Sequence, residues 1–383
     1  MYFEPSEEQK LLQQTVRKFV VKEVMPIAEK IDHEDRFPEE IFVELGNLGL
    51  LGITASEEYG GSGSGLLSQA IVAEELARAS AGLTSSYIAH SNLVIDNLDR
   101  HANHSQKMKY FPDLCTGEKI GCLAITEPGA GSDALAMQTK AIKDADFYIL
   151  NGSKTFITNG PVADVIVTYA KTAPELGPRG ISTLIVEKDF PGFSVGRKIE
   201  KMGHRGSPFS EIIFEDCKVP KENLVGEENS MVEMVLTGLH RERIVWSAEA
   251  VGIAQGAYDI AWRYAMQREQ FGRRLASFQM IQEKLVDMAL EIHIGRLLVQ
   301  RCAALADMDK DVDVGLESSY AKLYACDMAE RVASKAVQIL GGYGYTKEFQ
   351  VERYYRDAKA MPIGAGTSEI QRVMIARKLY GKI

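Results

Sequence analysis

Hydrophobic residues recur at helical spacing through the first 120 residues of the chain. Leu11, Leu12 and Val16 recur at the spacing of one helical face, after a serine at position 6 that suits a helix start. Residues 41–50, 67–77 and 105–114 carry the same pattern, and the glycine-rich stretch 57–65 predicts a loop between two of these helices. The pattern therefore predicts an all-helical N-terminal domain over residues 1–120.

The pattern changes at about residue 119. Short apolar, β-branched runs such as DVIVTYAK (164–171) and STLIVEK (182–188) alternate with turns rich in Gly, Pro, Asn and Asp. This texture predicts antiparallel strands that form a small barrel or sandwich over residues 121–228. No strand leads through a G-x-G-x-x-G turn into a helix, so a Rossmann dinucleotide fold is not predicted.

Helical spacing returns near residue 230 and continues to the end of the chain. The predicted helices cover residues 230–268, 277–308, 315–340 and 367–380, with turns at EQFGRRL and LGGYGYTKE. Long helices joined by short turns predict a C-terminal four-helix bundle over residues 229–383. The fold class is therefore multi-domain α+β, in the order helical domain, β domain and helical bundle.

Composition and charge limit the classes of function. Of the 383 residues 45% are hydrophobic and 25% charged, as in soluble globular proteins. No apolar run is long enough to cross a bilayer, so membrane insertion is not predicted. The first residues resemble neither a signal nor a transit peptide, which predicts a cytoplasmic protein, or a mitochondrial matrix protein if a presequence has been removed.

The formal net charge of −9 argues against nucleic acid as the main partner. The five cysteines are an odd number and form no C-x-x-C pair, so neither a disulfide framework nor a zinc site is predicted. No metal is expected.

One stretch, LHRERIVWSAEAVG (239–252), combines a charged group with an apolar helical face. Glu242 lies half a turn before the apolar run, and Trp246 follows it by four residues on the same side. A partly desolvated carboxylate has a raised pKa and can act as a general base. The alternative for this stretch alone is an ordinary surface glutamate paired with Arg241 or Arg243.

Six motifs in order resemble the acyl-CoA dehydrogenase family, and the resemblance covers essentially the whole chain. The motifs are ITEPGAGSD (125–133), KTFITNG (154–160), RGISTLIVEK (179–188), QREQFGRRLASFQ (267–279), QILGGYGY (338–345) and GAGTSEIQR (364–372). Members of this family oxidise acyl thioesters. A base removes the α-proton while a hydride leaves the β-carbon for FAD, so the resemblance implies FAD as cofactor.

The resemblance also implies where FAD binds. Phe156 would stack on the flavin ring, while Thr126 and Thr158 would offer hydroxyls to its polar edge. The pyrophosphate and adenosine would be held by a second group, in part from a neighbouring subunit. The full predicted set is Leu123, Ile125, Thr126, Gly131, Ser132, Phe156, Ile157, Thr158, Arg268, Phe271, Gln279, Gln338, Gly341, Gly342, Thr367 and Glu369.

The position of the base separates this chain from many members of the family. They carry the catalytic glutamate just before the G-T-S triplet, where this chain has Ala365. Isovaleryl-CoA dehydrogenases place it on a bundle helix within G-L-x-x-E-R, and this chain has GLHRER at residues 238–243. The resemblance therefore assigns the catalytic role to Glu242 and is strongest to the isovaleryl-CoA dehydrogenase branch.

Departures from that branch bear on the substrate. His240 stands where that branch has an Asp, and Trp246 where it has a smaller aliphatic residue. The indole would limit the depth of the acyl pocket, flatten it around a compact branched or cyclic group, or pack as ordinary core. No arginine lies within residues 86–98 to clamp a second carboxylate. The expected substrate is therefore a short branched, or a compact or cyclic, acyl-CoA. The residues expected to bind it are Ser132, His240, Arg243, Trp246, Ala365 and Gly366.

The family resemblance further implies an electron-transferring flavoprotein as electron acceptor and a homotetramer built as a dimer of dimers. Three alternatives stay open. The thioester could be carried by a carrier protein as an acyl or aminoacyl group, dioxygen could be the oxidant as in acyl-CoA oxidases, or the chain could be a flavin-bearing relative that binds nucleic acid.

Overall fold

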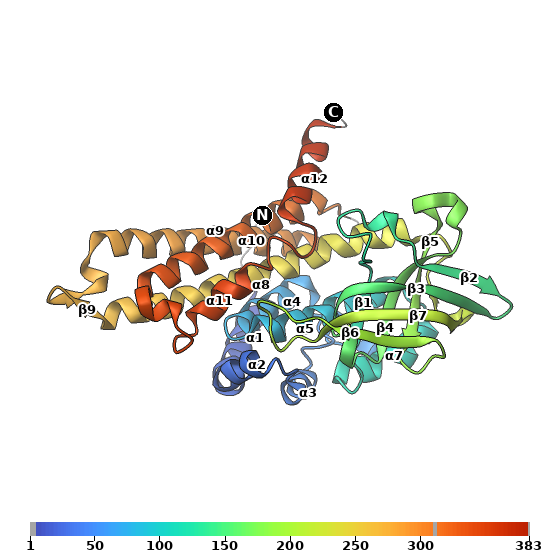
Figure 1. The fold of residues 1–383 in the computed structure, drawn as a ribbon, viewed down its shortest axis with the longest axis horizontal. Coiled ribbons are helices and arrows are strands. Elements are labelled where there is room, and N and C mark those ends of the chain that lie inside the picture. Colours follow the sequence, from blue (N-terminus) through green and yellow to red (C-terminus); the bar gives the residue numbers. More distant parts are fainter. Residues whose placement is uncertain (1–4, 309–311, 382–383) are drawn as a thin grey trace.

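The computed structural model describes residues 5–308 and 312–381, and the helix but not the side chains over residues 231–237. A helical N-terminal part, a β domain and a helical bundle follow one another along the chain. The β domain lies at one end of the elongated molecule and the tips of the bundle helices at the other (Figure 1). The predicted fold class is confirmed.

From residue 5 onwards, the N-terminal part consists of seven α-helices joined by loops and short helical segments. Ser6 caps the first helix, and the side chain that completes the capping box is Gln9. A π-helical segment over Ile88–Asp96 joins the fifth helix to the sixth. The α-helices are α1 (Glu7–Phe19), α2 (Ala28–Glu34), α3 (Glu39–Asn47), α4 (Gly65–Ala77), α5 (Ala81–Tyr87), α6 (Asn97–His101) and α7 (His104–Thr116).

The β domain is built around one eight-stranded sheet with the order β6-β7-β3-β2-β4-β5-β8, and β1 pairs with β4. The expectation of purely antiparallel pairing is wrong at β1–β4 and at β2–β4, where the strands run parallel. The strands are β1 (Gly121–Ala124), β2 (Lys140–Asp144), β3 (Phe147–Thr158), β4 (Val165–Lys171), β5 (Ile181–Glu187), β6 (Phe193–Lys198), β7 (Phe209–Pro220) and β8 (Leu224–Val225).

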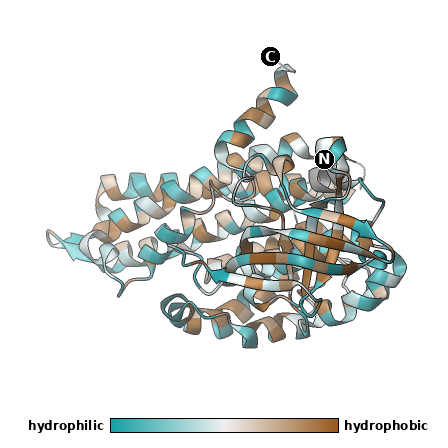
Figure 2. Cartoon of the chain, turned by 45° about the vertical axis from the view of Figure 1, so that its right-hand side comes forward, coloured by the Kyte–Doolittle hydropathy of each residue, from teal (hydrophilic) through white to brown (hydrophobic). Residues whose placement is uncertain are grey.

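The sheet separates two hydrophobic cores, because successive side chains of a strand point to opposite faces. On β4, Val165 and Val167 pack with Phe111 and Leu114 of the N-terminal helices. Ile166 points the other way and packs with residues of β3 and β7. Residues of β4 and β5 are accordingly buried on both faces, apart from the last residue of each strand, and hydrophobic residues run along the strands of the sheet in Figure 2. The helices thereby hold the β domain in a fixed orientation.

Three long helices form the C-terminal bundle: α8 (Met231–Gln267), α9 (Gln279–Met308) and α10 (Gly315–Leu340). A short hairpin of β9 (Glu269–Gln270) and β10 (Arg273–Arg274) connects α8 to α9. Two shorter helices follow, α11 (Val351–Ala358) and α12 (Ser368–Tyr380). The start of α12 is buried at Ser368 and Gln371, and the rest projects away from the bundle (Figure 1).

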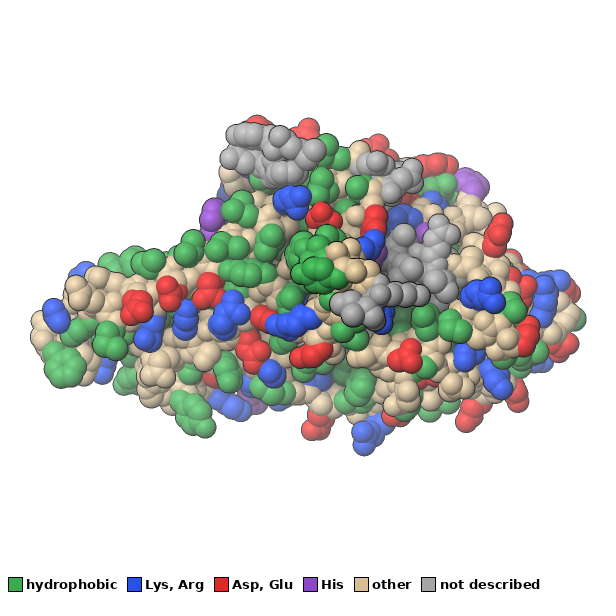
Figure 3. All heavy atoms as spheres, turned by 90° about the horizontal axis from the view of Figure 1, so that it is seen from above, with side chains coloured by type: hydrophobic (Ala, Val, Ile, Leu, Met, Phe, Trp, Pro, Cys, Tyr) green, Lys and Arg blue, Asp and Glu red, His purple; other side chains and the backbone are tan. Residues whose placement is uncertain are grey.

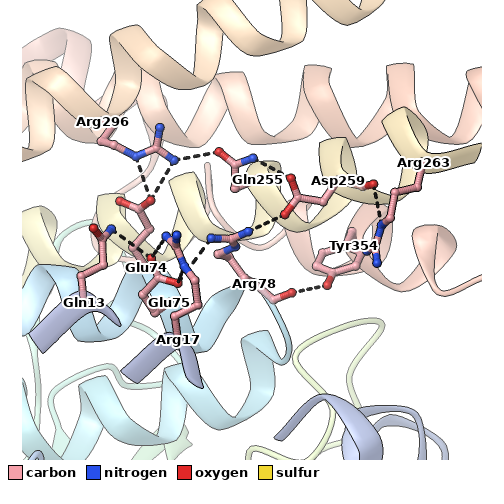
Figure 4. A network of polar contacts seen from close by, with 10 residues as sticks. All are labelled: Gln13, Arg17, Glu74, Glu75, Arg78, Gln255, Asp259, Arg263, Arg296 and Tyr354. Atoms are coloured by element: carbon pink, nitrogen blue, oxygen red, sulfur yellow. Dashed lines mark hydrogen bonds and ion pairs between the residues drawn. The ribbon is translucent and has the colours of Figure 1, made fainter. Parts of the chain in front are cut away.

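A polar network ties the N-terminal helices to the bundle (Figure 4). Glu75 of α4 accepts hydrogen bonds from Arg17 of α1, 2.9 and 2.5 Å long. Arg78, at the end of α4, forms a 2.6 Å ion pair with Asp259 of α8, and Arg296 of α9 forms a 2.8 Å pair with Glu74. Removing one partner of such a pair leaves a buried charge uncompensated, so the network fixes the register between these helices.

No helix within the described ranges is both long and apolar enough to span a membrane. Nor do the described His, Cys, Asp and Glu side chains gather into a group of three that could hold a metal ion.

Candidate active site

Glu242 lies on α8 and faces the interior of the molecule, where it keeps only limited solvent exposure. It forms no hydrogen bond or ion pair with another described side chain. Burial raises its pKa to about 7, although the charges of Arg243 and Lys322 act in the opposite direction. A carboxyl group with this pKa can lose and regain a proton near neutral pH.

The flanking arginine at position 241 does not neutralise Glu242. Two nitrogens of its guanidinium, Nε and Nη2, donate 2.8 Å hydrogen bonds to the two carboxylate oxygens of Asp96. Asp96 is buried in the π-helical segment and also forms a 3.4 Å ion pair with Arg100. The surface-pair interpretation of Glu242 therefore does not hold for Arg241.

Two other cations lie close to the carboxylate. Arg243 is 5% exposed, and its Nε and Nη1 have no hydrogen-bond acceptor among the described residues. Lys322 of α10 is fully buried, and its Nζ likewise has no partner there. Burial lowers the pKa of both groups. Buried donors without acceptors are costly unless a charge or ligand compensates them, and the carboxylate of Glu242 supplies a charge.

Trp246 sits one turn beyond Glu242 and is held on three sides. Its indole Nε1 donates a 3.1 Å hydrogen bond to the carbonyl of Met361, and its ring stacks on His204 with centroids 5.9 Å apart. A Cβ atom at Gly364 would lie 2.5 Å from the indole, so the backbone there packs directly on the ring. Trp246 is only partly buried, which leaves part of the indole surface uncovered by the protein.

The loop before α12 covers Arg243. Ala365 has φ of 53°, a left-handed conformation that is uncommon for a residue with a side chain. Gln371 stabilises the turn by donating 2.9 and 3.3 Å hydrogen bonds to the carbonyls of Gly366 and Ala365. The backbone N–H groups of Ala365 and Gly366 donate to no described residue. Thr367 caps α12, and Glu369 is exposed in its first turn.

A small cavity lies between the β domain and α8 and is lined by residues of both. Its wall includes Leu123 and Ile125, two predicted flavin contacts, and Leu239, which lies one turn before Glu242. Tyr169 also lines the cavity, and its pKa is raised to about 12, chiefly by burial and in part by the charge of Glu242. The other lining residues are Asn92, Leu93, Asn97, Arg100 and Gly238.

A buried ion pair shapes the loop that carries Gly131 and Ser132. Lys154 Nζ lies 2.8 Å from Glu127 Oε1, and Glu127 also accepts hydrogen bonds from the backbone N–H groups of Gln138 and Thr139, at 2.5 and 3.0 Å. Both ends of the loop are therefore attached to one carboxylate. Gly131 and Ser132 lie exposed at its tip.

The end of β3 presents an aromatic ring to the outside. Phe156 is 57% exposed, has φ of 60°, and stacks on Phe209 at 5.8 Å. The strand register shifts at this point, so a bulge turns the side chain outwards. Thr126 and Thr158 are partly exposed beside it. The side chain of Ile157 points into the core of the β domain, which leaves only its backbone for a ligand.

The remaining predicted cofactor residues lie at the far end of the bundle. Arg268 ends α8 and places its guanidinium 5.7 Å from the ring of Tyr343, which brings the hairpin next to the turn after α10. Phe271 and Gln279 line one surface depression. Figure 1 places this hairpin and the sheet of the β domain at opposite ends of the molecule. One chain therefore does not bring the two halves of the predicted site together. The exposed residues Gln338, Gly341 and Gly342 belong to the distal half.

His240 occupies a different environment from that of the other predicted substrate contacts. It packs against the start of α10, where a Cβ at Gly315 would lie 2.7 Å from the imidazole. Burial, with the nearby charge of Arg243, lowers its pKa to about 4, so the ring is neutral. The sequence did not reveal Lys322 as part of the site, because a lysine among apolar helical residues usually marks a solvated edge. Nor did it reveal the pair of Lys154 on β3 and Glu127 in the loop, because their contact arises only from tertiary packing.

Curated relatives are similar to the chain over nearly its whole length. The mitochondrial isovaleryl-CoA dehydrogenase of Pongo abelii is 46% identical over 376 residues, which are 97% of this chain and 88% of the relative. The short-chain-specific acyl-CoA dehydrogenase of Clostridium acetobutylicum is 43% identical over 99% of this chain and 100% of the relative.

Solved structures show the same architecture. Butyryl-CoA dehydrogenase from Megasphaera elsdenii superposes with a TM-score of 0.96 at 38% identity and covers 99% of this chain and 100% of its own. A chain of a structure described as the electron transferring flavoprotein of Acidaminococcus fermentans gives 0.97 at 39%, with both chains covered completely. The prolyl acyl carrier protein oxidase AnaB gives 0.94 at 34%, covering 98% of this chain and 100% of its own.

Three family models match in succession. The N-terminal domain of acyl-CoA dehydrogenase matches residues 6–118, the middle domain residues 122–217 and the C-terminal domain residues 232–380. Relatives of this identity act as oxidoreductases on the CH–CH group of acyl-CoA. A carboxylate of raised pKa on the bundle helix and matches along the whole chain lead to one conclusion: the chain belongs to the acyl-CoA dehydrogenase family.

Proposed function

We propose that the protein dehydrogenates a short branched or compact acyl-CoA to the 2-enoyl-CoA, with Glu242 as the base that removes the α-proton. One observation carries this proposal. Glu242 is the carboxylate that faces inwards on α8 with a pKa of about 7 and no partner among the described side chains, while Ala365 leaves the alternative position without an acid.

The two buried cations help Glu242 to act as a base. A carboxyl group in this environment would be protonated at neutral pH if burial acted alone. The positive charges of Arg243 and Lys322 favour the ionised form and keep part of the population ready to accept a proton. Arg241 takes no part, because Asp96 already binds two nitrogens of its guanidinium.

The loop before α12 supplies donors for the thioester carbonyl. Removal of the α-proton places negative charge on that oxygen, and preorganised N–H groups stabilise it. The backbone N–H groups of Ala365 and Gly366 fit this role, because neither donates to another described residue. The turn that holds them is rigid, since Gln371 binds both carbonyls and Trp246 packs against Gly364.

The residues fit FAD in two separate places. A Cβ at Gly131 or Gly342 would meet no protein atom within 4 Å, and neither glycine has a positive φ, so neither packing nor backbone conformation explains the missing side chain. Room for a closely approaching ligand does explain it. Phe156 offers a flat exposed ring near Thr126 and Thr158. When bound, FAD supplies the hydride acceptor.

The separation of the two halves supports a shared cofactor site in an oligomer. Arg268, Phe271 and Gln279 would hold the pyrophosphate and adenosine of a flavin whose ring lies on a neighbouring subunit. Phe271 is 93% exposed, and further exposed hydrophobic side chains lie along the part of the helical bundle that ends in this hairpin (Figure 3). Apolar exposure of this extent indicates a protein interface. We infer a homotetramer, with an electron-transferring flavoprotein as electron acceptor.

The choice of acyl group rests on Trp246. An indole held one turn beyond the base shortens the space along α8, which favours compact or branched groups over long straight ones. The names of the relatives agree in part, since isovaleryl-CoA and short-chain enzymes are among them. AnaB acts on a carrier-bound prolyl group, so carrier-bound thioesters belong in any substrate panel.

The assignment of the base is tested by Glu242→Gln. The variant should keep its yellow flavin but lose bleaching when an acyl-CoA substrate is added anaerobically, because the amide cannot accept the proton. Glu8→Gln, an exposed glutamate on α1, is the matched control and should bleach normally. Bleaching that persists in Glu242→Gln would exclude this residue as the base.

The substrate assignment is tested with straight, branched and cyclic acyl thioesters, each as CoA and as carrier-protein derivatives. The branched or compact CoA esters should give the highest kcat/KM. Trp246→Leu should raise kcat/KM for longer straight chains relative to branched ones by roughly tenfold, the usual effect of added room in an apolar pocket. An unchanged ratio would show that the indole does not limit the pocket. Release of hydrogen peroxide on turnover would instead favour an oxidase.

A further inference from the structure

A second buried glutamate lies on the same side of α8 as the base. Glu249 follows Glu242 by seven residues, two helical turns, with Trp246 between them. It is fully buried. Its Oε1 lies 3.0 Å from the hydroxyl of Ser85 on α5, and its Oε2 has no partner among the described residues.

Ser85 also contacts a histidine, whose tautomer the geometry determines. His204 Nε2 lies 2.9 Å from the backbone carbonyl of Asp357, which can only accept, so Nε2 carries a hydrogen. Nδ1 of the same ring lies 2.7 Å from Ser85 Oγ and 3.5 Å from Glu249 Oε1. The hydroxyl has one hydrogen and can give it either to Nδ1 or to Glu249.

The two choices place charge differently. If Ser85 donates to Glu249, Nδ1 must carry a hydrogen as well, and the group is an imidazolium beside a carboxylate. If Ser85 donates to Nδ1, Glu249 must be a carboxylic acid that donates to Ser85, and all three groups are neutral. Both choices hold the same number of protons.

The unpaired oxygen decides between them. A buried carboxylate with one oxygen unsolvated is far more costly than a carboxylic acid whose carbonyl is unpaired. Burial raises the pKa of Glu249 and lowers that of His204, and both effects favour the neutral cluster. The charge of Asp357 on α11 further raises the pKa of Glu249, and Lys201 further lowers that of His204. The hydrogen bond from Ser85 to Glu249 and the contacts of Asp357 with His204 act in the opposite direction. On α10, Cys326 is neutral because burial raises its pKa to about 12.

The neutral cluster of Glu249, Ser85 and His204 contacts the indole of Trp246 through the imidazole ring. His204 is fixed by its backbone N–H, which donates a 2.6 Å hydrogen bond to Asp357, and the close approach of Gly82 to the carbonyl of Arg205 locks its loop onto α5. The imidazole of His204 stacks on the indole of Trp246, and the planes of the two rings differ by 22°. The position of the indole therefore depends on Glu249 through Ser85 and His204.

We propose that Glu249 is a carboxylic acid at neutral pH and that Glu249, Ser85 and His204 are positioning residues which hold Trp246 as the wall of the acyl pocket. The second part rests on the proposed function, since it takes Trp246 as that wall. The first part does not.

Infrared difference spectroscopy of the holoenzyme tests the proton on Glu249. At pH 9, where Glu242 with its pKa of about 7 is ionised, the carbonyl stretch of a buried carboxylic acid should remain. It should be absent in Glu249→Gln and present in Glu242→Gln, the matched control. No such band in the unsubstituted protein at pH 9, or a band that survives Glu249→Gln, would overturn the assignment and leave the role of Glu242 untouched.

Fluorescence and specificity test the positioning role. The chain has two tryptophans, so Trp262→Phe leaves Trp246 as the only indole reporter. In that background Glu249→Gln, which is neutral and can still donate to Ser85, should keep the emission maximum and the preference among acyl chains. Glu249→Leu, which cannot donate, should shift the emission and change the ratio of kcat/KM for straight over branched chains by roughly tenfold. If Trp246→Leu changes that ratio while Glu249→Leu changes neither readout, the positioning role is refuted.

Discussion

The environment of a single carboxyl group explains how one helix can carry two glutamates with different roles. Glu242 has two cations nearby and a pKa of about 7, so it can exchange a proton at neutral pH. No lysine or arginine among the described residues pairs with Glu249, and the ring of His204, 3.5 Å from its Oε1, is neutral in the proposed arrangement. Burial therefore raises the pKa of Glu249 well above the usual range. Both residues are glutamates on the same side of α8. Their different pKa values arise from the side chains that α5, α10 and α11 pack against them.

The pKa of Glu242 predicts a pH dependence of catalysis. The base must be ionised, so the rate of flavin reduction by substrate should rise as the pH passes through about 7 and then level off. Lys322→Met removes a positive charge that favours ionisation and should move this midpoint to higher pH, while Lys322→Arg should largely keep it. Stopped-flow measurements across pH 5–9 check this, and a midpoint that Lys322→Met leaves in place would contradict the role of the lysine.

The same raised pKa predicts an effect on stability. Between pH 4.5 and 7 the unfolded chain has lost the proton of Glu242 and the folded chain still holds it, so the folded state loses stability as the pH rises through this window. Glu242→Gln removes this loss. At pH 8 the variant should have a higher free energy of unfolding, on the order of 1 to 3 kcal/mol, and about the same value as the parent at pH 4. Urea unfolding at the two pH values checks the difference.

At the level of elements, the hydrophobic pattern predicted the bundle well. Residues 315–340 and 277–308 correspond closely to α10 and α9. In these helices hydrophobic residues recur at helical spacing over many turns, with polar residues on the opposite face. The pattern gave no bounds for α5, α6 and the π-helical segment between them, since almost all their side chains are buried and no polar stripe marks the period. Helix α11 is only eight residues long and was not predicted.

Strand pairing was harder to predict than strand position. The strands β4 and β5 lie where the apolar, β-branched runs predicted them, but local pattern does not specify which strand lies next to which. The parallel pairing of β1 with β4 joins residues more than 40 positions apart in sequence. The candidate site shows the same limit. Motif positions located Phe156 and Arg268, whereas Lys322 and Lys154 became part of the site only through packing between elements.

The buried pair of Lys154 and Glu127 predicts how the loop of residues 127–139 is held. Lys154→Met leaves Glu127 buried without its cation and should lower the free energy of unfolding by about 3–5 kcal/mol. It should also weaken FAD retention, because Gly131 and Ser132 lie on the loop. Adding Glu127→Gln to Lys154→Met should restore a substantial part of the free energy of unfolding and of FAD retention, because no unpaired charge then stays buried. Urea unfolding and flavin content after gel filtration measure the effects, and strict additivity of the two changes would contradict coupling.

For the whole molecule, the proposed sharing of the cofactor site between subunits, which rests on the distance between the hairpin and the β domain, would link cofactor binding to assembly. Phe271→Asp places a charge on the most exposed hydrophobic side chain of the hairpin and should both dissociate the oligomer and lower flavin content. Phe147→Asp, an exposed phenylalanine on β3, is the control and should change neither. Light scattering after gel filtration, with absorbance of the flavin, checks both. An oligomer that survives Phe271→Asp with full flavin content would contradict a shared site.

The contact between Trp246 and Gly364 has a consequence for redesign of this protein. The indole supports the same turn that leads through Thr367 into α12, so a smaller residue at position 246, chosen to enlarge the proposed acyl pocket, also removes a support of residues expected to reach the cofactor. Broader substrate range and firm flavin binding are therefore coupled at this position. Variants selected only for larger substrates will tend to lose colour unless a second change restores the packing under Gly364.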